Sequence, residues 1–343
     1  MQAIKIVDLF AGPGGLDIAA EKLGLAVTGI EWDDDACATR RRQGLQTIHS
    51  DVRKVDQTAF ADANVLTGGP PCQTYTVAGA GAGRRALDKV LRCTELMAEG
   101  SLSPSDVIKL GDERTALVLE PLRWALEAIR AGRPYQAIVL EQVRTVIPVW
   151  EAVATVLRQH DYSVVCDVLK AEEYGVPQTR RRAILIARHR GKASLPKTTH
   201  RPHRKGVNRL SGDPEKQPWV TMSDVLTHRP TPFTVVSNYG TGGDPKARGR
   251  RNHDEPSATV TGKIDRNRVL GPHGSENRFT HPEAGMLQTF PADYRWSGSR
   301  IPQQIGNAIP PVLAAHVLSA ALDLDRETLG AAVKDLSGGT IRI

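Results

Sequence analysis

Short apolar runs alternate with amphipathic stretches through the first half of the chain. The runs have the length of buried strands, and the stretches between them repeat apolar residues at helical spacing. The predicted strands are 4–10, 26–30, 65–66, 137–140, 162–169 and 183–187. The predicted helices are 16–23, 34–42, 117–131 and 149–159. Strands that alternate with helices predict an α/β fold with a doubly wound, Rossmann-like sheet.

Two segments depart from this alternation. Residues 79–111 are rich in Gly and Ala and then charged, which predicts a mobile loop with a helical insert. From Arg188 to about Ser275 the periodicity fades and Pro, Gly, His and Arg dominate, which predicts a separate small domain. A final apolar helix is expected over 310–324. We therefore expect a large domain built from 1–187 and 301–330 and a smaller domain over 188–300.

Composition argues against several classes of protein. No run of about 18 apolar residues occurs, so no transmembrane helix is expected. The chain enters its first predicted strand at once, and no signal peptide is expected. The four cysteines lie far apart without CxxC spacing, which argues against a zinc site and against a disulfide framework. These features predict a cytoplasmic protein with no metal and no membrane partner.

The net charge of +7 is distributed unevenly along the chain. Between residues 188 and 275 there are 17 Lys and Arg and 7 Asp and Glu, a net of +10, which leaves −3 for the remainder. A basic excess confined to one segment is expected where that segment meets a polyanion, although a solvated basic face is the simpler alternative. The charges cluster in Gly- and Pro-rich loops, at Arg201, Arg204, Lys205, Arg209, Lys246, Arg248, Arg250 and Arg251.

The first predicted strand leads into a glycine-rich turn, Asp8–Gly15, that precedes a helix. Such a turn lets a ligand approach the backbone and the free N–H groups of a helix N-terminus, although a tight turn with positive φ needs the same glycines. Its spacing differs from GxGxxG and no P-loop pattern occurs, which disfavours a nicotinamide cofactor and a nucleoside triphosphate. At later strand ends, Glu31 could bond a ribose diol, Trp32 could cover an adenine and Asp51 could accept from its amine. Together these residues indicate a cofactor that carries adenosine and a non-phosphate tail.

Further strand ends carry residues suited to catalysis. Cys72 lies in a Gly/Pro-rich turn after an apolar run, and is either a nucleophile on a stiff strand end or a small buried apolar residue. Glu141 ends another strand and suits either a general acid or a structural acceptor. Strand alternation puts Gln178, Arg180 and Arg182 on one face. The guanidinium groups of Arg180 and Arg182 could orient a carboxylate, a phosphate or a ring carbonyl, or could belong to a solvated basic turn.

Ten blocks of sequence occur in an order that is typical of one enzyme family. The blocks are Asp8–Gly15, Glu31-Trp32, Asp51-Val52, Gly68–Gln73, Asp112–Arg114 with Leu117, Glu141–Val143, Gln178–Arg182, Pro256–Val260, Glu283 with Gln288–Pro291, and Gly306–Ala308. In these blocks the chain resembles the DNA (cytosine-5)-methyltransferases, from Ile6 to about Leu322. The order is unpermuted, because the last block is C-terminal.

The resemblance implies a fold, a cofactor, a substrate and a set of site residues. It implies a methyltransferase sheet that binds S-adenosylmethionine, joined to a smaller target-recognition domain that binds double-stranded DNA. It implies methyl transfer to C5 of a cytosine rotated out of the duplex, through an adduct between Cys72 and C6. A monomer is expected, with a cognate restriction endonuclease as a further partner.

The site residues implied by the resemblance fall into three groups. The catalytic residues are Cys72, Glu141, Arg180 and Arg182. The cofactor-binding residues are Phe10, Gly12, Gly14, Gly15, Glu31, Trp32, Asp51, Val52, Pro70, Leu117 and Asn307. The DNA-binding residues are Gln178, Arg248, Arg250, Arg251, Thr259 and Val260.

The chain departs from the family pattern at three places. Gln142 stands where the family has Asn, which lengthens by one methylene an amide that supports the turn. Met286 stands where the family has an Arg after the late Glu, which questions a buried ion pair at Glu283. The insert before Arg114 is longer than usual.

The alternative functions are an RNA cytosine-5 methyltransferase, a catalytically silent DNA-binding protein on this fold and, more distantly, a nicotinamide-dependent dehydrogenase.

Overall fold

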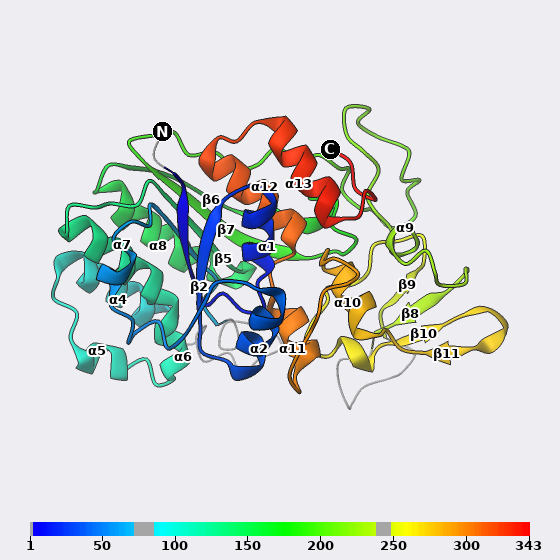
Figure 1. Cartoon of the computed structure of the whole chain (residues 1–343), viewed down its shortest axis with the longest axis horizontal. Coiled ribbons are helices and arrows are strands. Elements are labelled where there is room, and N and C mark those ends of the chain that lie inside the picture. The colour runs from blue at the N-terminus through cyan, green and yellow to red at the C-terminus, as the bar shows by residue number, and fades with distance from the viewer. Residues whose placement is uncertain (1–2, 72–85, 238–247) are drawn as a thin grey trace.

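The computed structural model describes residues 3–71, 86–237 and 248–343. The main body is a central sheet with helices on both of its faces, and a smaller, strand-containing part lies beside it (Figure 1). Cys72 and the residues up to 85 lie outside the described part of the chain. The predicted loop over 79–111 is therefore seen only from residue 86 onward.

The central sheet has seven strands among the described residues, in the order β3-β2-β1-β4-β5-β7-β6. Its strands are β1 Lys5–Leu9, β2 Ala26–Glu31, β3 Thr47–His49, β4 Val65–Gly68, β5 Ala137–Val143, β6 Tyr162–Lys170 and β7 Arg181–His189. Strands β1 to β5 pair in parallel, whereas β7 is antiparallel to both β5 and β6. The order reverses between β1 and β4, which is where open α/β sheets bind their ligands. The predicted doubly wound fold is confirmed.

Helices cover both faces of this sheet. The α-helices among the described residues are α1 Gly15–Lys22, α2 Asp34–Gln43, α4 Leu87–Glu99, α5 Pro104–Ile108, α6 Glu113–Ala116, α7 Glu120–Arg130, α8 Ile147–Arg158, α9 Met222–Val225, α10 His281–Leu287, α11 Ile301–Asn307, α12 Pro311–Leu322 and α13 Arg326–Leu336. Helices α1, α12 and α13 pack together on one face, and α4, α7 and α8 cover the other (Figure 1). The predicted helices are present with ends shifted by at most two residues, except that 117–119 form a separate 3-10 turn before α7.

Alternation along the strands assigns successive residues to two separate cores. In β1, Ile6 belongs to the cluster with α1 and α12, whereas Val7 and Leu9 belong to the cluster with α7 and α8. In β5, Val139 and Leu140 divide in the same way. Because successive side chains of a strand point to opposite faces, a strand buried on both sides is apolar along most of its length. This explains why these strands appear in the sequence as continuous apolar runs.

The segment predicted as a small domain contains a second sheet. Its strands are β8 Thr234–Val236, β9 Arg250–Asn252, β10 Arg268–Leu270 and β11 Glu276–Asn277, in the order β11-β10-β8-β9. Val235 and Val269 of this sheet belong to the same apolar cluster as α12 of the main body. The segment is thus held to the main body by a shared core, and the exact domain boundaries remain a prediction.

One stretch of the described residues, Ile301–Leu322, has the length and apolar composition of a helix that could cross a membrane, with a mean hydropathy of 1.5. About 83% of that window is buried inside the fold, where α12 packs against α1 and β5. This stretch serves here as a core helix.

A buried ion pair joins α1 to α2 beneath the glycine-rich turn. Asp17 and Arg40 are fully buried and form two parallel contacts, Nη1 to Oδ2 at 2.8 Å and Nη2 to Oδ1 at 2.6 Å. Arg40 also donates to the Gln46 carbonyl oxygen and to Thr47 Oγ1, at 3.0 and 2.9 Å. The pair holds α2 against α1 and against the chain that enters β3.

Replacing Arg40 with Ala should strongly destabilise the protein, because it leaves the Asp17 carboxylate buried without its cation. We expect the free energy of unfolding to fall by about 3–5 kcal/mol. The matched control is Arg41→Ala, which removes an exposed neighbour on the same helix and should change stability by about 0.5 kcal/mol or less. Urea unfolding of the two variants makes the comparison, and equal losses would contradict this role for the pair.

Two buried histidines lie where the main sheet meets the segment after β7. His200 and His316 are both almost inaccessible to solvent, and the His316 ring lies 5.2 Å from the ring of Tyr174. Burial lowers the pKa of His200 to about 4 and that of His316 to about 3. Both histidines are therefore neutral in the folded protein at pH values where unfolded histidines take up protons.

Stability should fall as the pH drops below about 6.5, because the unfolded chain then binds protons at two histidines that the folded chain keeps neutral. Between pH 6.5 and 5 this costs about 2 kcal/mol for each histidine. His316→Gln should remove about half of that pH dependence. His281→Gln alters an exposed histidine and should leave it unchanged. Unfolding midpoints at pH 7 and pH 5 test this, and the idea fails if His316→Gln keeps the full pH dependence.

Candidate active site

A cavity of about 400 Å³ opens at the edge of the sheet where β1, β2, β4 and β5 end. The lining residues include Asp8, Phe10, Gly12, Gly15, Glu31, Trp32, Asp51, Val52, Pro70, Pro71, Leu117, Glu141, Arg182, Arg300, Gln303 and Asn307. Parallel strands bring their carboxyl ends to one edge, which explains how residues far apart in the sequence converge here. Of the predicted cofactor residues, only Gly14 is missing from this lining.

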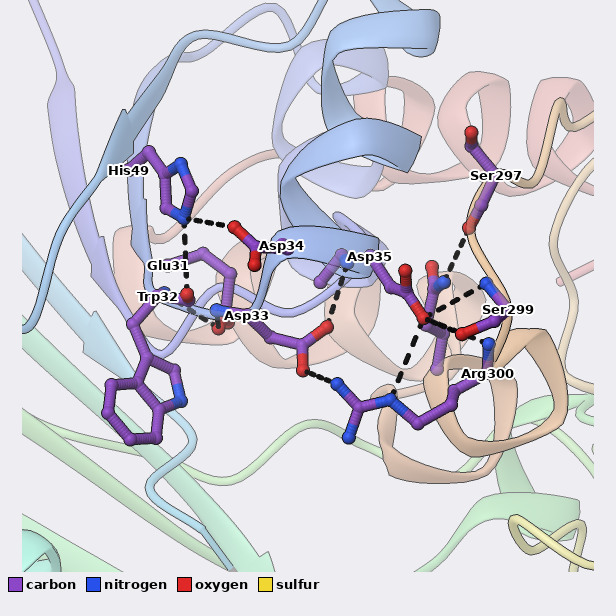
Figure 2. A network of polar contacts seen from close by, with 11 residues as sticks. Glu31, Trp32, Asp33, Asp34, Asp35, His49, Ser297, Ser299 and Arg300 are labelled. Atoms are coloured by element: carbon purple, nitrogen blue, oxygen red, sulfur yellow. Dashed lines mark hydrogen bonds and ion pairs between the residues drawn. The ribbon is translucent and has the colours of Figure 1, made fainter.

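The glycine-rich turn is held by the carboxylate of Glu31. Gly12 has a φ of +56° and donates its N–H to Glu31 Oε2 at 2.7 Å. Glu31 Oε1 accepts from the backbone N–H groups of Trp32 and Asp33, both at 2.8 Å (Figure 2). Burial raises the pKa of Glu31, and the three N–H donors oppose that rise. The Glu31 carboxylate is therefore fixed at the cavity wall with its orientation set by the backbone.

Gly14 and Gly15 shape the turn from its outer side. Gly14 has a φ of +99°, which side chains rarely adopt. A Cβ at Gly15 would lie 2.4 Å from the carbonyl oxygen of Ile309, so α1 could not approach the chain before α12 with any other residue there. Gly14 thus allows the left-handed backbone conformation of the turn, and Gly15 allows the chain before α12 to pack closely against α1.

An exposed aromatic ring stands at one end of the cavity. Trp32 has 66% of its surface exposed, which is unusual for an indole in the described structure. Its neighbours there are Asp51, which is only 12% exposed at its side chain, and Val52, which is buried. The hydrogen bond of Asp51 with Arg53 lowers the pKa of Asp51, so this carboxylate is ionised at neutral pH. This end of the cavity therefore offers a flat apolar face next to an ionised acceptor.

A further part of the cavity wall comes from the C-terminal part of the chain, from Arg300, Gln303 and Asn307. Asp35 accepts from the N–H of Ser299, from its hydroxyl and from the N–H of Arg300, at 2.9–3.0 Å (Figure 2). The Arg300 side chain also pairs with Asp33. These contacts fasten the start of α11 to α2, which places Gln303 and Asn307 against the cavity. Sequence reasoning missed the pairing of Arg300 with Asp33, because 267 residues separate the partners.

The Gly/Pro turn after β4 is tied to β5. The Gln142 side-chain amide donates to the Pro70 carbonyl oxygen and accepts from the N–H of Val143. The extra methylene of Gln142 is therefore accommodated, and its amide still supports the turn. Pro70 and Pro71 line the cavity, and Cys72 follows them directly in the sequence but lies outside the described residues.

Glu141 and Arg182 meet at the base of this turn. Arg182 Nε lies 2.7 Å from Glu141 Oε1, and the two side chains are only 12% and 14% exposed. The nearest side-chain atom to a Cβ built at Gly69 is Glu141 Oε2, at 3.5 Å, which places the carboxylate beside the turn that leads to Cys72. The two predicted catalytic groups thus form one ion pair inside the cavity.

Three predicted site residues are buried in the framework. Arg180, predicted to be catalytic, is fully buried and donates to the carbonyl oxygens of Val260, Gly306 and Ala308 at 2.9–3.0 Å. Gln178, predicted to contact DNA, is also fully buried and bonds the carbonyl oxygen of Leu287 and the N–H of Val260. Val260 is buried as well. The catalytic role of Arg180 and the DNA contacts of Gln178 and Val260 stay predictions.

The other predicted DNA-binding residues lie nearer to solvent. Arg250 and Arg251 belong to β9, an edge strand of the second sheet, and Arg250 is exposed. Arg251 Nη1 lies 3.3 Å from Glu255 Oε1, and Arg248 is partly buried. The Thr259 hydroxyl donates to the carbonyl oxygen of Thr179 at 2.7 Å. Contact of these four residues with DNA stays a prediction.

The late glutamate has an ion pair despite Met286. Arg229 Nη2 lies 2.7 Å from Glu283 Oε2, and His228 Nε2 lies 2.8 Å from Glu283 Oε1. Burial raises the pKa of Glu283, but hydrogen bonds from Arg229, the Thr280 N–H and His228 outweigh it and lower this pKa to about 2. Glu283 thus has an ion pair, which Met286 had put in question, and its cation comes from the connection between α9 and β8.

Among the residues that the structure describes, no group of three or more His, Cys, Asp or Glu side chains could hold a metal ion. Two carboxylates of the cavity are paired with arginines, Glu141 with Arg182 and Asp51 with Arg53.

Comparisons with known proteins show which family the chain matches. The profile of the family described as C-5 cytosine-specific DNA methylase matches residues 4–91 and 112–322. The type II methyltransferase M1.HphI of Haemophilus parahaemolyticus is 27% identical over 94% of this chain and 88% of its own length. The type II methyltransferase M.PspPI of Psychrobacter sp. (strain TA137) is 29% identical over 98% of this chain and 82% of its own length.

Solved structures show the same fold at low sequence identity. The Dnmt2 methyltransferase of S. pombe superposes with a TM-score of 0.60 at 15% identity, covering 93% of this chain and 98% of that one. The methyltransferase EhMeth of Entamoeba histolytica gives a TM-score of 0.60 at 14% identity, covering 94% and 99%. The family profile covers most of the chain and includes Glu141 and Arg182 of the cavity. The chain therefore belongs to the C-5 cytosine-specific DNA methylase family.

Proposed function

We propose that this protein transfers a methyl group from S-adenosylmethionine to C5 of a cytosine that has been rotated out of double-stranded DNA. One observation carries the proposal: the Glu141–Arg182 ion pair and the turn before Cys72 line the same cavity as Glu31, Trp32 and Asp51. The groups proposed for catalysis and the groups proposed to bind the adenosine of the cofactor thus line one site.

The cavity suits S-adenosylmethionine in size and in the chemistry of its walls. Its volume of about 400 Å³ lies in the range of small-ligand sites. Glu31 would hold the ribose hydroxyls, Trp32 would cover the adenine and Asp51 would accept from the adenine amine. Phe10, Gly12, Val52, Pro70, Leu117 and Asn307 would form the remaining walls. When bound there, this cofactor supplies an electrophilic methyl group.

The residues of the chain make cytosine reactive toward that group. The Cys72 thiolate adds to C6 of the ring, which breaks conjugation and makes C5 nucleophilic. Glu141 shares a proton with ring N3, so charge that builds on the ring is neutralised. Arg182 holds Glu141 in place and can donate to the ring carbonyl. After C5 has gained the methyl group, C5 loses its proton to a base and the thiolate leaves C6.

The basic segment would hold the duplex. Arg248, Arg250 and Arg251 are charged groups near the edge of the second sheet, and such groups contact phosphates or guanine edges. Rotating one base out of the stack costs a few kcal/mol, which phosphate contacts would offset. The names of the relatives describe type II methyltransferases, which supports a role beside a cognate restriction endonuclease. We expect the protein to act as a monomer.

Replacing Cys72 with Ser should abolish methylation while DNA and cofactor binding persist, because a hydroxyl is a far weaker nucleophile toward C6. Bisulfite sequencing of DNA from expressing cells should show cytosines protected in one sequence context with the wild-type protein and none with Cys72→Ser. Cys166→Ser is the matched control and should methylate normally, since Cys166 does not line the cavity. Normal methylation by Cys72→Ser would remove Cys72 from the mechanism.

The substrate is tested in vitro with the wild-type protein. Methyl transfer to RNA of the same sequence but not to duplex DNA would contradict DNA as the substrate.

Replacing Glu141 with Gln should slow methyl transfer by about 100-fold or more, because the amide has no acidic proton to share with the ring. Single-turnover rates with a radiolabelled methyl donor measure the step directly. The equilibrium constant for cofactor binding should stay within about 2-fold, since the Gln side chain keeps its shape. Glu151→Gln, an exposed change on α8, is the control. A rate within a few-fold of the wild type would assign the acid role to another group.

A further inference from the structure

Arg53 makes more contacts with Asp51 than a surface ion pair would need. Its Nε lies 3.0 Å from both carboxylate oxygens of Asp51, and its Nη2 lies 2.5 Å from Oδ2. Its backbone N–H also donates to Asp51 Oδ1 at 2.9 Å. Four contacts from one residue fix the plane of the Asp51 carboxylate, because a guanidinium fork and a carboxylate are both flat.

The remaining guanidinium nitrogen of Arg53 is held from another part of the chain. Arg53 Nη1 pairs with the carboxylate of Glu113, the first residue of α6. Arg53 therefore has a partner at each end of its guanidinium group, and it cannot turn away from Asp51 without losing the contact with Glu113. Helix α6 follows α5 in the chain, so this partner of Arg53 lies 60 residues further along the sequence.

Arg53 also stands between the cavity and the solvent. It lines the cavity together with Asp51 and Trp32, and the same three residues line a more open hollow that continues outward past Lys54 and Glu113. The Asp51 side chain is only 12% exposed, whereas that of Arg53 is 35% exposed. Removing the Arg53 side chain would thus both free the Asp51 carboxylate to rotate and open the Trp32 end of the cavity to water.

We propose that Arg53 is a positioning residue that aims the Asp51 carboxylate at the exocyclic amine of the cofactor's adenine, and thereby makes the site reject a purine with a carbonyl group at C6. This inference rests on the proposed function, which places the adenine between Trp32 and Asp51. An acceptor with a fixed orientation favours a 6-amino group, which donates, and repels a 6-oxo group, which only accepts. A carboxylate that can rotate, or that water can reach, discriminates less between the two.

The test compares two ligands whose purines differ at C6, which carries an amino group in one and an oxo group in the other, and at the adjacent N1, which carries a hydrogen in the oxo form. They are S-adenosylhomocysteine and its 6-oxo analogue S-inosylhomocysteine, and calorimetry on the full-length protein gives the dissociation constant of each. The wild-type protein should bind the adenosyl ligand about 100-fold more tightly than the inosyl ligand. In Arg53→Ala the adenosyl ligand should bind about 10-fold more weakly, and the preference should shrink below about 10-fold. Arg53→Lys should lie between, because lysine keeps the charge without the fork.

Two further variants distinguish a failure of this inference from a failure of the proposed function. Lys54→Ala removes an equal charge from the next residue, which does not line the cavity, and should keep both constants within about 2-fold. If Lys54→Ala matches Arg53→Ala, charge alone is responsible and the inference is overturned. Asp51→Ala should abolish most of the preference. If it does not, the placement of the adenine in the proposed function is overturned.

If Asp51→Ala loses the preference but Arg53→Ala keeps it, Arg53 has no positioning role and the proposed function stands. Thermal unfolding of each variant, which should match the wild type within a few degrees, shows that the folds are comparable. A binding ratio between two ligands adds a safeguard, because partial misfolding lowers the amount of active protein without altering the ratio.

Discussion

The site depends on the direction in which β7 runs beside β5. The two strands are antiparallel, with Val143 opposite Arg182 and Glu141 opposite Ile184. Glu141 and Arg182 are therefore diagonal neighbours on one face of the sheet, within reach of each other. A parallel β7 would place Arg182 at the other edge of the sheet, roughly 20 Å away. A slip of one residue in the register would turn Arg182 to the opposite face.

A second constraint joins the basic segment to the same edge of the sheet. Arg180 and Gln178 lie just before β7 and bond the backbone around Val260, Leu287 and Gly306. These partners come from three separate parts of the chain, of which Val260 lies inside the basic segment and Leu287 and Gly306 follow it. Because each bond is buried, leaving one unmade would cost about 1–3 kcal/mol. The charged β9 edge is thus connected through a short, rigid framework to the pair that we propose acts on the base.

The sequence was sufficient for features that depend on local pattern. Apolar runs predicted the strands, and the glycines of 8–15 and the polar residues Glu31 and Asp51 predicted one end of the cavity, because each follows a strand of a parallel sheet. The pattern could not distinguish Arg180 from Arg182, which share a strand face and differ only in what the folded chain brings to each. It also could not find Arg229 as the partner of Glu283, or Arg300 as the partner of Asp33. Those pairs join segments that are distant in sequence, and no spacing rule connects them.

In the proposed mechanism, Cys72 and cytosine C6 form a covalent bond that, once C5 carries the methyl group, breaks only when C5 loses its proton. Duplex DNA with 5-fluorocytosine at the target position tests it directly, because fluorine at C5 cannot leave as a cation. We expect a complex of protein and DNA that survives denaturation, forms only with S-adenosylmethionine present, and yields after digestion a DNA adduct on the peptide that contains Cys72. Failure to trap a complex while the same duplex with ordinary cytosine is methylated, or an adduct on any other residue, would contradict the account.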